Sequence, residues 1–405
     1  MKLLRSVSTR RLLIMLVSVV VVVAGAAAIA MAATGGGPQP DPKPLPVAIQ
    51  DALSAPQVQG VSARIKFTNT LISGSDVQGA DPILTGASGR LWATSDGHLR
   101  IELQADSSSD GASSDSQVLS DGKTAWVYDS GSNTVYKGTL PADQQAGAGT
   151  SQTDSPPSLT QIKDSLAQLA DHAIVSGAQP SDVAGQPAYT VRVEPKQNGG
   201  LVGGAELAWD AVHGTPLRVA VYAKGDTSPV LELTVTDISY GNVPSSVFDI
   251  SPPPGAQVTD LSPQTSGASG GGDKNGETAP VTGLQAVQQQ TSFPVDAPQT
   301  LAGMPQSEVR LIQSGKDAGA LVTYGQGLGG IAVIEQPADP AQSSANSSGG
   351  DHGQLSLPTV SINGTQGQEL ETALGTAVRF QRNGVQYTVL GSVPAATAQA
   401  AARAL

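Results

Sequence analysis

Apolar and polar residues alternate with a period of two through much of the segment 85–136. The alternation is clearest at 99–104 and at 125–128. Successive side chains of a strand point to opposite sides of a sheet, so the pattern predicts strands with one dry and one wet face. Ser-Asp-Gly clusters at 95–97 and 120–122 separate the segments and are typical of tight reversals. The stretch therefore predicts an antiparallel meander.

The same one-sided alternation appears before and after this meander. A first strand is expected at 61–70, and four further strands are expected at 189–194, 205–210, 216–223 and 230–240. Between the two groups, Ser158 and Gln161 form a Ser-x-x-Gln capping box, and apolar residues then recur at spacings of three and four, which predicts a helix. A shorter helix is expected at 47–53. A sheet with one dry face needs such a cover.

Two motifs within the meander resemble the outer-membrane lipoprotein carrier (LolA) family. They are Gly89-Arg90-Leu91-Trp92 and the hairpin sequence SDGKTAWVY at 120–128, with Leu99-Arg100 between them. The resemblance covers residues 45–258. It implies a mainly β domain with some α, a half-open antiparallel β-barrel with plugging helices that enclose an apolar site for acyl chains.

The resemblance, combined with the alternation, implies which side chains would line that site. We expect a lipid-binding cavity formed by Ile65, Phe67, Trp92, Leu99, Ile101, Leu103, Trp126, Tyr128, Val191, Val193, Leu207, Trp209, Val219, Val221, Leu231 and Leu233. The lid helix would contribute Leu159, Ile162, Leu166 and Leu169. The alternative interpretation is that the three tryptophans only fill the core of the domain.

The composition of the rest of the chain predicts a linker followed by a second domain. Residues 259–280 are rich in Gly, Ser and Pro and predict a flexible linker. Residues 281–405 predict a smaller α+β domain with a disordered insertion at 337–353, weakly similar to a small extracytoplasmic domain of unknown function. Its expected elements are a helix at 281–290, strands at 308–312, 359–362, 377–381 and 385–390, a hairpin at 320–335 and a closing helix at 395–405.

Residues 1–34 read as a membrane-directing segment. Basic residues precede an uncharged apolar run, Leu12–Ala33, whose 22 residues would span roughly 33 Å as a helix. Two interpretations stay open: an uncleaved transmembrane anchor, or a signal peptide cleaved near Ala32. A Gly/Pro linker follows at 35–46. In both cases the bulk of the chain is expected outside the cytoplasm.

Charge and reactive residues narrow the function. The net charge is −12 and Lys and Arg do not cluster beyond the N-terminus, so nucleic acid is not expected as a partner. The chain has no cysteine, and its four histidines do not fall in ligand spacings, so neither a metal site nor a cofactor is expected. Asp121 is expected to form a turn. No catalytic motif stands out, so we expect no catalytic residues and no enzyme.

The leading hypothesis is a membrane-anchored, extracytoplasmic, carrier-like protein that binds a lipid or an acylated protein. It would lie at the plasma membrane with a single span, Leu12–Ala33, or be secreted after cleavage near Ala32. The alternative is an RseB/MucB-like sensor, because relatives of the carrier fold pair it with a smaller domain and bind an anti-sigma factor at the membrane. Its partner would be an anti-sigma or other envelope protein.

Overall fold

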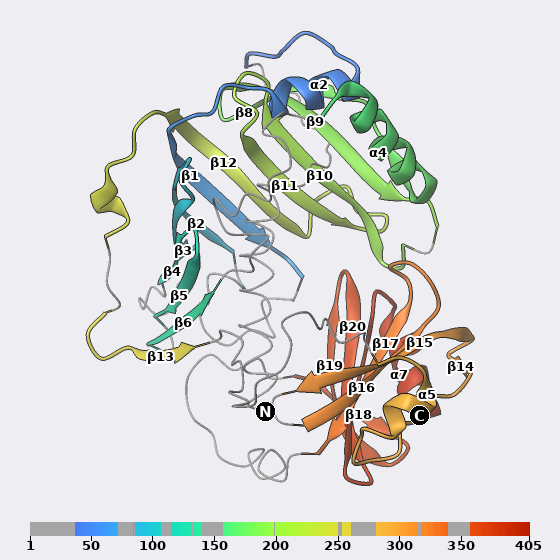
Figure 1. Ribbon diagram of the computed structural model, residues 1–405. Coiled ribbons are helices and arrows are strands. Elements are labelled where there is room, and N and C mark those ends of the chain that lie inside the picture. Colours follow the sequence, from blue (N-terminus) through green and yellow to red (C-terminus); the bar gives the residue numbers. More distant parts are fainter. Residues whose placement is uncertain are drawn as a thin grey trace, which may run out of the picture.

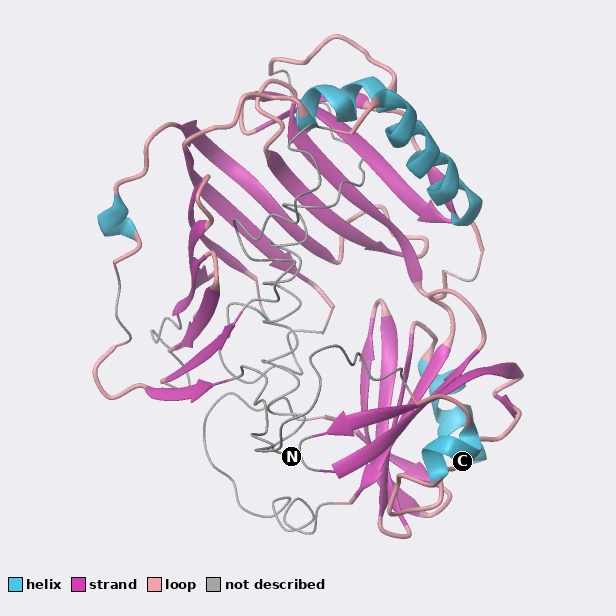
Figure 2. Ribbon diagram, in the orientation of Figure 1, coloured by secondary structure: helices cyan, strands magenta, loops and turns pink. Residues whose placement is uncertain are grey.

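The computed structural model describes residues 37–71, 84, 86–106, 115–130, 133–139, 157–197, 199–249, 253–260, 281–314, 317–338 and 357–405. The expected segment Leu12–Ala33, nearly all of the linker 259–280 and most of the insertion 337–353 lie outside them. Within the described ranges, no helix combines the length and the apolar character needed to cross a membrane. The described residues form two antiparallel sheets with helices against them (Figure 2).

The first sheet has 13 strands in the order β13-β6-β5-β4-β3-β2-β1-β12-β11-β10-β9-β7, with β8 beside β9. It curls from β9 across β1 to β6, and only β13 runs parallel to its neighbour (Figure 1). The strands are β1 (Gly60–Asn69), β2 (Ala87–Thr94), β3 (His98–Ala105), β4 (Asp115–Asp121), β5 (Thr124–Asp129), β6 (Thr134–Thr139), β7 (Ala173–Val175), β8 (Gln179–Val183), β9 (Gln186–Pro195), β10 (Val202–Asp210), β11 (Pro216–Ala223), β12 (Leu231–Tyr240) and β13 (Gln257–Asp260). The expected half-open antiparallel barrel is confirmed.

Turn chemistry explains the meander. The Asp121 carboxylate accepts hydrogen bonds from the backbone N–H groups of Lys123 and Thr124, at 2.9 and 2.6 Å. Gly122 has a φ of 81°, a left-handed conformation that glycine adopts without steric cost. These contacts reverse the chain between β4 and β5, so the predicted turn role of Asp121 is confirmed.

Two helices cover one face of the sheet, which we call the inner face; the opposite side is the outer face. Helix α4 (Leu159–His172) begins at the predicted capping box, in which the Ser158 hydroxyl accepts from the Gln161 N–H. Helix α2 (Leu45–Leu53) starts with a proline in its first turn. Both helices pack on β9 and β10, where Leu45 and Ala48 meet Tyr189 and Trp209.

After β12 the chain crosses to the outer face. There a 3-10 turn, Ser245–Val247, lies beside β3, and the Arg100 guanidinium donates to the Val247 carbonyl oxygen at 2.8 Å. The chain then adds β13 next to β6. The domain therefore continues to Asp260, two residues beyond the predicted boundary at 258.

The second sheet has eight strands in the order β14-β15-β16-β17-β21-β20-β19-β18. They are β14 (Thr300–Leu301), β15 (Met304–Ser314), β16 (Asp317–Tyr324), β17 (Ile331–Pro337), β18 (Thr359–Ile362), β19 (Thr365–Thr372), β20 (Gly375–Arg382) and β21 (Val385–Gly391). Helices α5 (Leu284–Gln288) and α7 (Ala395–Ala404) pack into one core with the sheet. The predicted strands are confirmed, whereas β14 and β19 were not expected and α5 is shorter than the predicted helix.

Backbone contacts join the two sheets. The Leu201 N–H, at the β9–β10 turn, donates to the carbonyl oxygen and hydroxyl of Ser392 at 3.0 and 2.9 Å. A Cβ on Gly200 would lie 2.0 Å from the Ser392 carbonyl oxygen, so only glycine allows this approach. A second contact runs from the Ala373 N–H to the Leu71 carbonyl oxygen, at 3.4 Å.

Candidate functional site: an apolar inner face

Strand register builds a continuous apolar row on the inner face. Leu91 of β2 lies opposite Ile101 of β3, which lies opposite Val118 of β4 and then Val127 of β5. Side chains paired across neighbouring strands share one face, so these residues pack together. With Val61, Ala63 and Ile65 of β1 they form one buried cluster. The alternation read from the sequence therefore places Ile65, Leu99, Ile101 and Leu103 on one side, as expected.

At the other end of the sheet, the inner face is covered by the helices. Tyr189 and Val191 of β9 and Leu207 and Trp209 of β10 are buried there. Ile162 of α4 is buried, whereas Leu159, Leu166 and Leu169 are half-buried; of these three, Leu166 packs against the cluster. Two of the four predicted lid residues therefore hold α4 in place, and the others remain partly accessible to solvent.

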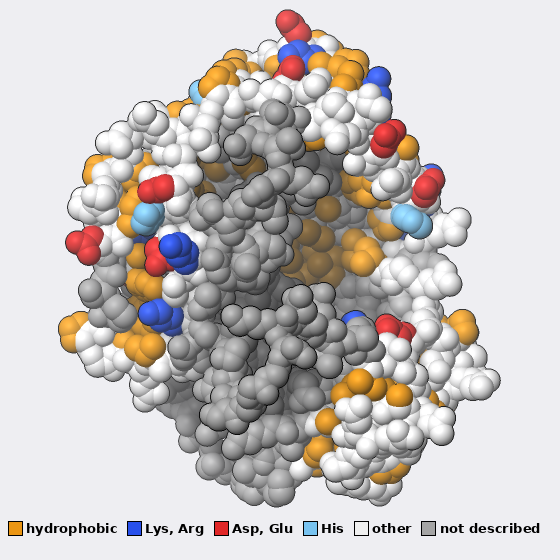
Figure 3. All heavy atoms as spheres, viewed as in Figure 1, with side chains coloured by type: hydrophobic (Ala, Val, Ile, Leu, Met, Phe, Trp, Pro, Cys, Tyr) orange, Lys and Arg blue, Asp and Glu red, His pale blue; other side chains and the backbone are white. Residues whose placement is uncertain are grey.

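Between the two clusters lies a less covered strip on β11 and β12. Its residues are Val219, Val221, Leu231, Leu233 and Val235, and each is only half-buried. Val219 packs at the edge of the cluster under the helices, and Leu233 and Val235 pack at the edge of the cluster on β1–β5. Figure 3 shows hydrophobic side chains lining the hollow next to α4, on this part of the sheet. The strip is an apolar surface that the described helices leave partly open.

Trp209 contributes a polar atom to this face. Its ring packs 6.1 Å from that of Tyr189, and the residue is 4% exposed. Within the described part of the chain its indole N–H has no hydrogen-bond partner. Buried polar groups are normally paired, so the pairing of this donor is incomplete within the described residues. Of the three tryptophans, this is the one on the inner face.

Trp92, Trp126 and Tyr128 do not line the inner face, and this part of the predicted cavity is wrong. Trp92 lies opposite Arg100, and Trp126 lies opposite Leu119 and Lys137, all on the outer face. The prediction followed the larger aromatic side chains of β5. The register instead turns the smaller residues of that strand, Ala125 and Val127, toward the apolar cluster.

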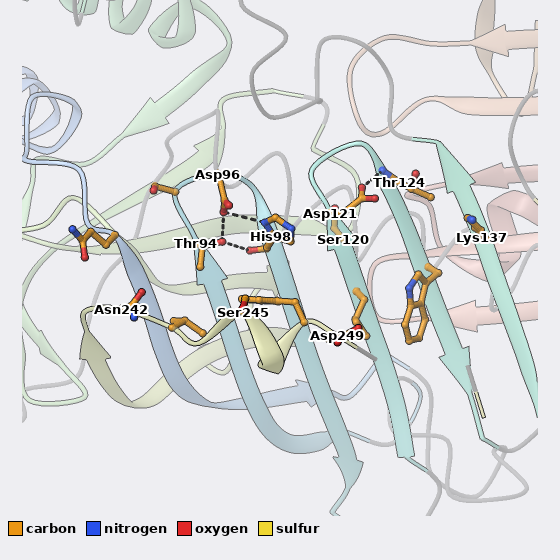
Figure 4. Close-up of a pocket in the computed structure, with 16 residues that line it drawn as sticks. Thr94, Asp96, His98, Ser120, Asp121, Thr124, Lys137, Asn242, Ser245 and Asp249 are labelled. Carbon is orange, nitrogen blue, oxygen red and sulfur yellow. Dashed lines mark hydrogen bonds and ion pairs between the residues drawn. The ribbon is translucent and has the colours of Figure 1, made fainter. Parts of the chain in front are cut away.

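Of these three aromatic residues, Trp126 lines a partly polar cavity on the outer face that the sequence did not reveal. It measures about 630 Å³ and lies between β2–β6 and the returning tail; Figure 4 shows the residues that line it. Trp126 and Leu119 face Phe248 and Asp249 of the tail across it. The cavity could not be predicted from local sequence, because its walls come from segments near residues 120 and 245 that only the fold brings together. The one signal would have been a predicted contact between the Ser-Asp-Gly turns and the Val-Pro-Ser segment of the tail.

Several polar groups that line this cavity have partners within it, among them Asp96 and Asp121. The Asp96 carboxylate accepts from the Thr94 hydroxyl and contacts the His98 ring, and these two interactions lower the Asp96 pKa to about 2. Figure 4 shows the three side chains turned toward one another. The predicted structural role of His98 agrees with this contact. The tail therefore forms one wall of this cavity.

Farther along the outer face, a network of paired charges connects β9, β10, β11 and β12. The buried Glu206 carboxylate accepts from Arg192 at 3.2 Å and from Arg218 at 2.5 Å, and also from the Tyr222 hydroxyl. Burial, followed by the bond to Glu206, raises the pKa of Tyr222 to about 12. Arg218 also pairs with Glu232, and Arg192 with Glu194. A buried charge needs such partners, so this network is structural.

No protein-family model and no curated protein matches the sequence. Among solved structures, the chain is similar to MucB of the Pseudomonas aeruginosa MucA/MucB complex, with 18% identity over 88% of this chain and 95% of that chain and a TM-score of 0.38. A putative outer-membrane lipoprotein-sorting protein domain from Vibrio parahaemolyticus matches 51% of this chain and 96% of its own, with 11% identity and a TM-score of 0.22. A LolA superfamily protein from Nitrosomonas europaea matches 51% and 98%, with 8% identity and a TM-score of 0.21. These likenesses are distant, so the functional argument rests on the site. The curled antiparallel sheet with helices on its inner face has the half-open shape that the motifs imply.

Proposed function

We propose that this chain is a non-enzymatic, extracytoplasmic binding protein whose LolA-like domain holds the acyl chain of a lipid or lipoprotein. The observation that carries the proposal is the half-buried apolar strip of β11 and β12, between two buried clusters. A fully self-sufficient core would bury these side chains. The segment Leu12–Ala33 would keep the protein at the membrane, where acylated ligands are found.

The energetics favour an acyl chain over a polar ligand on this face. Each methylene taken out of water contributes about 0.8 kcal/mol, so a long chain lying along the strip would gain several kcal/mol even after ordering costs. The strip continues into the buried residues of β1 on one side and β10 on the other. The indole N–H of Trp209, which has no partner within the described residues, would supply a donor for an ester or carboxylate oxygen that reaches under the helices.

Two neighbouring residues of β12 provide the test. Leu233 lies on the inner face opposite Phe67, and Thr234 lies on the outer face opposite Lys66. We expect Leu233→Glu to abolish uptake of a fluorescent fatty acid and to strip copurifying lipid, because it puts a charge on the apolar strip. Thr234→Glu should leave both unchanged. Wild-type protein that neither carries lipid nor takes up the probe would rule the proposal out.

A protein partner in place of a lipid is the second candidate. The contacts of Leu201 with Ser392 and of Leu71 with Ala373 attach the second domain directly to the carrier-like domain. Such a two-domain platform suits a sensor that binds an anti-sigma or other envelope protein. Capture of a single-pass anti-sigma protein by the intact chain, with no lipid recovered, would favour this candidate over lipid carriage.

A further inference from the structure

A second cavity on the outer face lies over β1 to β4, away from the tail. It measures about 710 Å³ and sits where β12 bulges against β1, with Thr236 as the extra residue of the bulge. Its charged lining consists of Arg64, Lys66, Arg90, Glu102 and Asp115. Because side chains alternate along β1, this cavity faces away from the apolar strip and is a separate site.

The basic residues of this cavity lie close to one another and repel each other. Arg64 of β1 lies directly opposite Arg90 of β2, and Lys66 lies two pairs farther along, on the same face, opposite Ser88. Like charges directly opposite each other in a sheet are destabilising. Asp237 is the β12 neighbour of Arg64 in the register. Within the described residues, however, none of the three cations forms an ion pair; the ion pairs there belong to other residues.

Other arginines on the same face show that pairing is the rule there. Arg100 pairs with Glu102, Arg192 with Glu194, and Arg218 with Glu206 and Glu232. Glu102 is therefore already engaged, which leaves Asp115 as the other carboxylate of the lining. Two opposed, exposed arginines that have no carboxylate partner among the described residues stand out in a chain of net charge −12.

The uncharged part of the lining suits an anion with several oxygens. Gln104, Gln117 and Thr236 supply amide and hydroxyl donors around the cations, whereas the Ser88 hydroxyl already donates to the Asp106 carboxylate at 2.6 Å. Arginine binds phosphate oxygens in a bidentate manner, and two opposed guanidinium groups would both be satisfied by one phosphate. We propose that the Arg64–Arg90 cavity binds a phosphate group, either free or as the phosphodiester of a lipid headgroup, at a site distinct from the acyl-chain strip.

The test compares two double variants of the full chain. Calorimetric titration with inorganic phosphate and with a short-chain phosphatidylglycerol below its micelle concentration should show binding to wild type, weakened roughly tenfold or more in Arg64→Gln/Arg90→Gln. The control, Lys224→Gln/Arg310→Gln, removes the same charge at two exposed positions outside the cavity and should bind as wild type does. Lys66→Gln should show a smaller loss.

Two further readouts make the result decisive. In the absence of ligand, Arg64→Gln/Arg90→Gln should melt at the wild-type temperature or above it, because a like-charge pair is removed. Binding of inorganic phosphate alone would assign a free phosphate, and binding of phosphatidylglycerol, with vesicles of that lipid pelleting wild type more than the variant, would assign a headgroup. Equal weakening in the control, equal binding by the variant, or no binding of any probe would overturn the proposal.

Discussion

The two sheets of this protein solve the same problem in different ways. Each is antiparallel with one apolar face and short covering helices. In the second domain, α5, α7 and the sheet form a single cluster in which Val322, Val333 and Val389 are completely buried. In the first domain the apolar face is divided among separate clusters, and the β11–β12 strip between them is half-buried. One face is closed by its own helices, and the other stays partly open between its clusters.

The two domains also differ in how they accommodate a buried glutamate. Glu206 of the first domain accepts hydrogen bonds from two arginines. Glu335 of the second domain is completely buried in the sheet core, where one carboxylate oxygen accepts from the Asp296 N–H at 2.9 Å and the other has no partner within the described residues. The closed core therefore tolerates an incompletely satisfied carboxyl group, whereas the open domain pairs its buried charge on the outer face.

The largest expected effect separates the closed core from the open strip. Phe380 is 3% exposed and stacks on Tyr387 with ring centroids 5.0 Å apart, so Phe380→Ala should cost about 3–5 kcal/mol. Leu233→Ala removes a half-buried side chain and should cost only about 1 kcal/mol. Hydrogen exchange resolved by domain during urea unfolding measures both, since two domains need not unfold together. Equal costs would mean that the strip is an ordinary core.

The next effect is a pH dependence confined to the second domain. Burial, added to the nearby Asp296 carboxylate, raises the pKa of Glu335 to about 8. As the pH rises from about 4.5 to 8, the unfolded chain releases this proton and the folded chain retains it, so the free energy of unfolding falls, by an amount on the order of a few kcal/mol. Glu335→Gln should flatten this decline.

Glu308→Gln is the matched control for that experiment. Glu308 lies on β15 and is exposed, so its replacement should leave the pH profile of the second domain unchanged. Melting temperatures between pH 5 and 9 provide the measurement. A wild-type profile that stays flat through this range would show that the Glu335 carboxyl group is solvated or paired in solution.

The two-residue period of apolar side chains and the Ser-Asp-Gly turns were sufficient to predict most strands. Both signals depend only on residues close together in the sequence. The capping box at Ser158 located α4 for the same reason. The strands that were missed lack that local signal. β8 contains Pro180 and Asp182, and β13 forms only by pairing with β6, far away in sequence. Such elements depend on tertiary contacts rather than on their own pattern.

The faces of the aromatic residues show where sequence reasoning failed at the site. Alternation fixes which residues share a face but not which face is turned inward. The largest side chains of β2 and β5 suggested the interior, yet Trp92 lies under the Arg100 guanidinium, 5.3 Å from its ring, on the outer face. The tail that covers this face comes from 241–249, so the sequence around Trp92 holds no sign of it.

The smallest effect concerns how each domain holds its helix. α7 begins at Pro394 without a side-chain cap and is secured by the buried Ala398, Ala401 and Ala402, whereas α4 buries only Ile162 and relies on its capping box. Ser158→Ala should therefore lower the local stability of α4 by about 1 kcal/mol. Hydrogen exchange within 159–172 should accelerate, while Thr160→Ala, an exposed change in the same turn, should not alter it. Unchanged exchange in the Ser158 variant would mean that packing on β9 and β10 alone fixes the helix, and that the inner face is more firmly closed than its half-buried strip indicates.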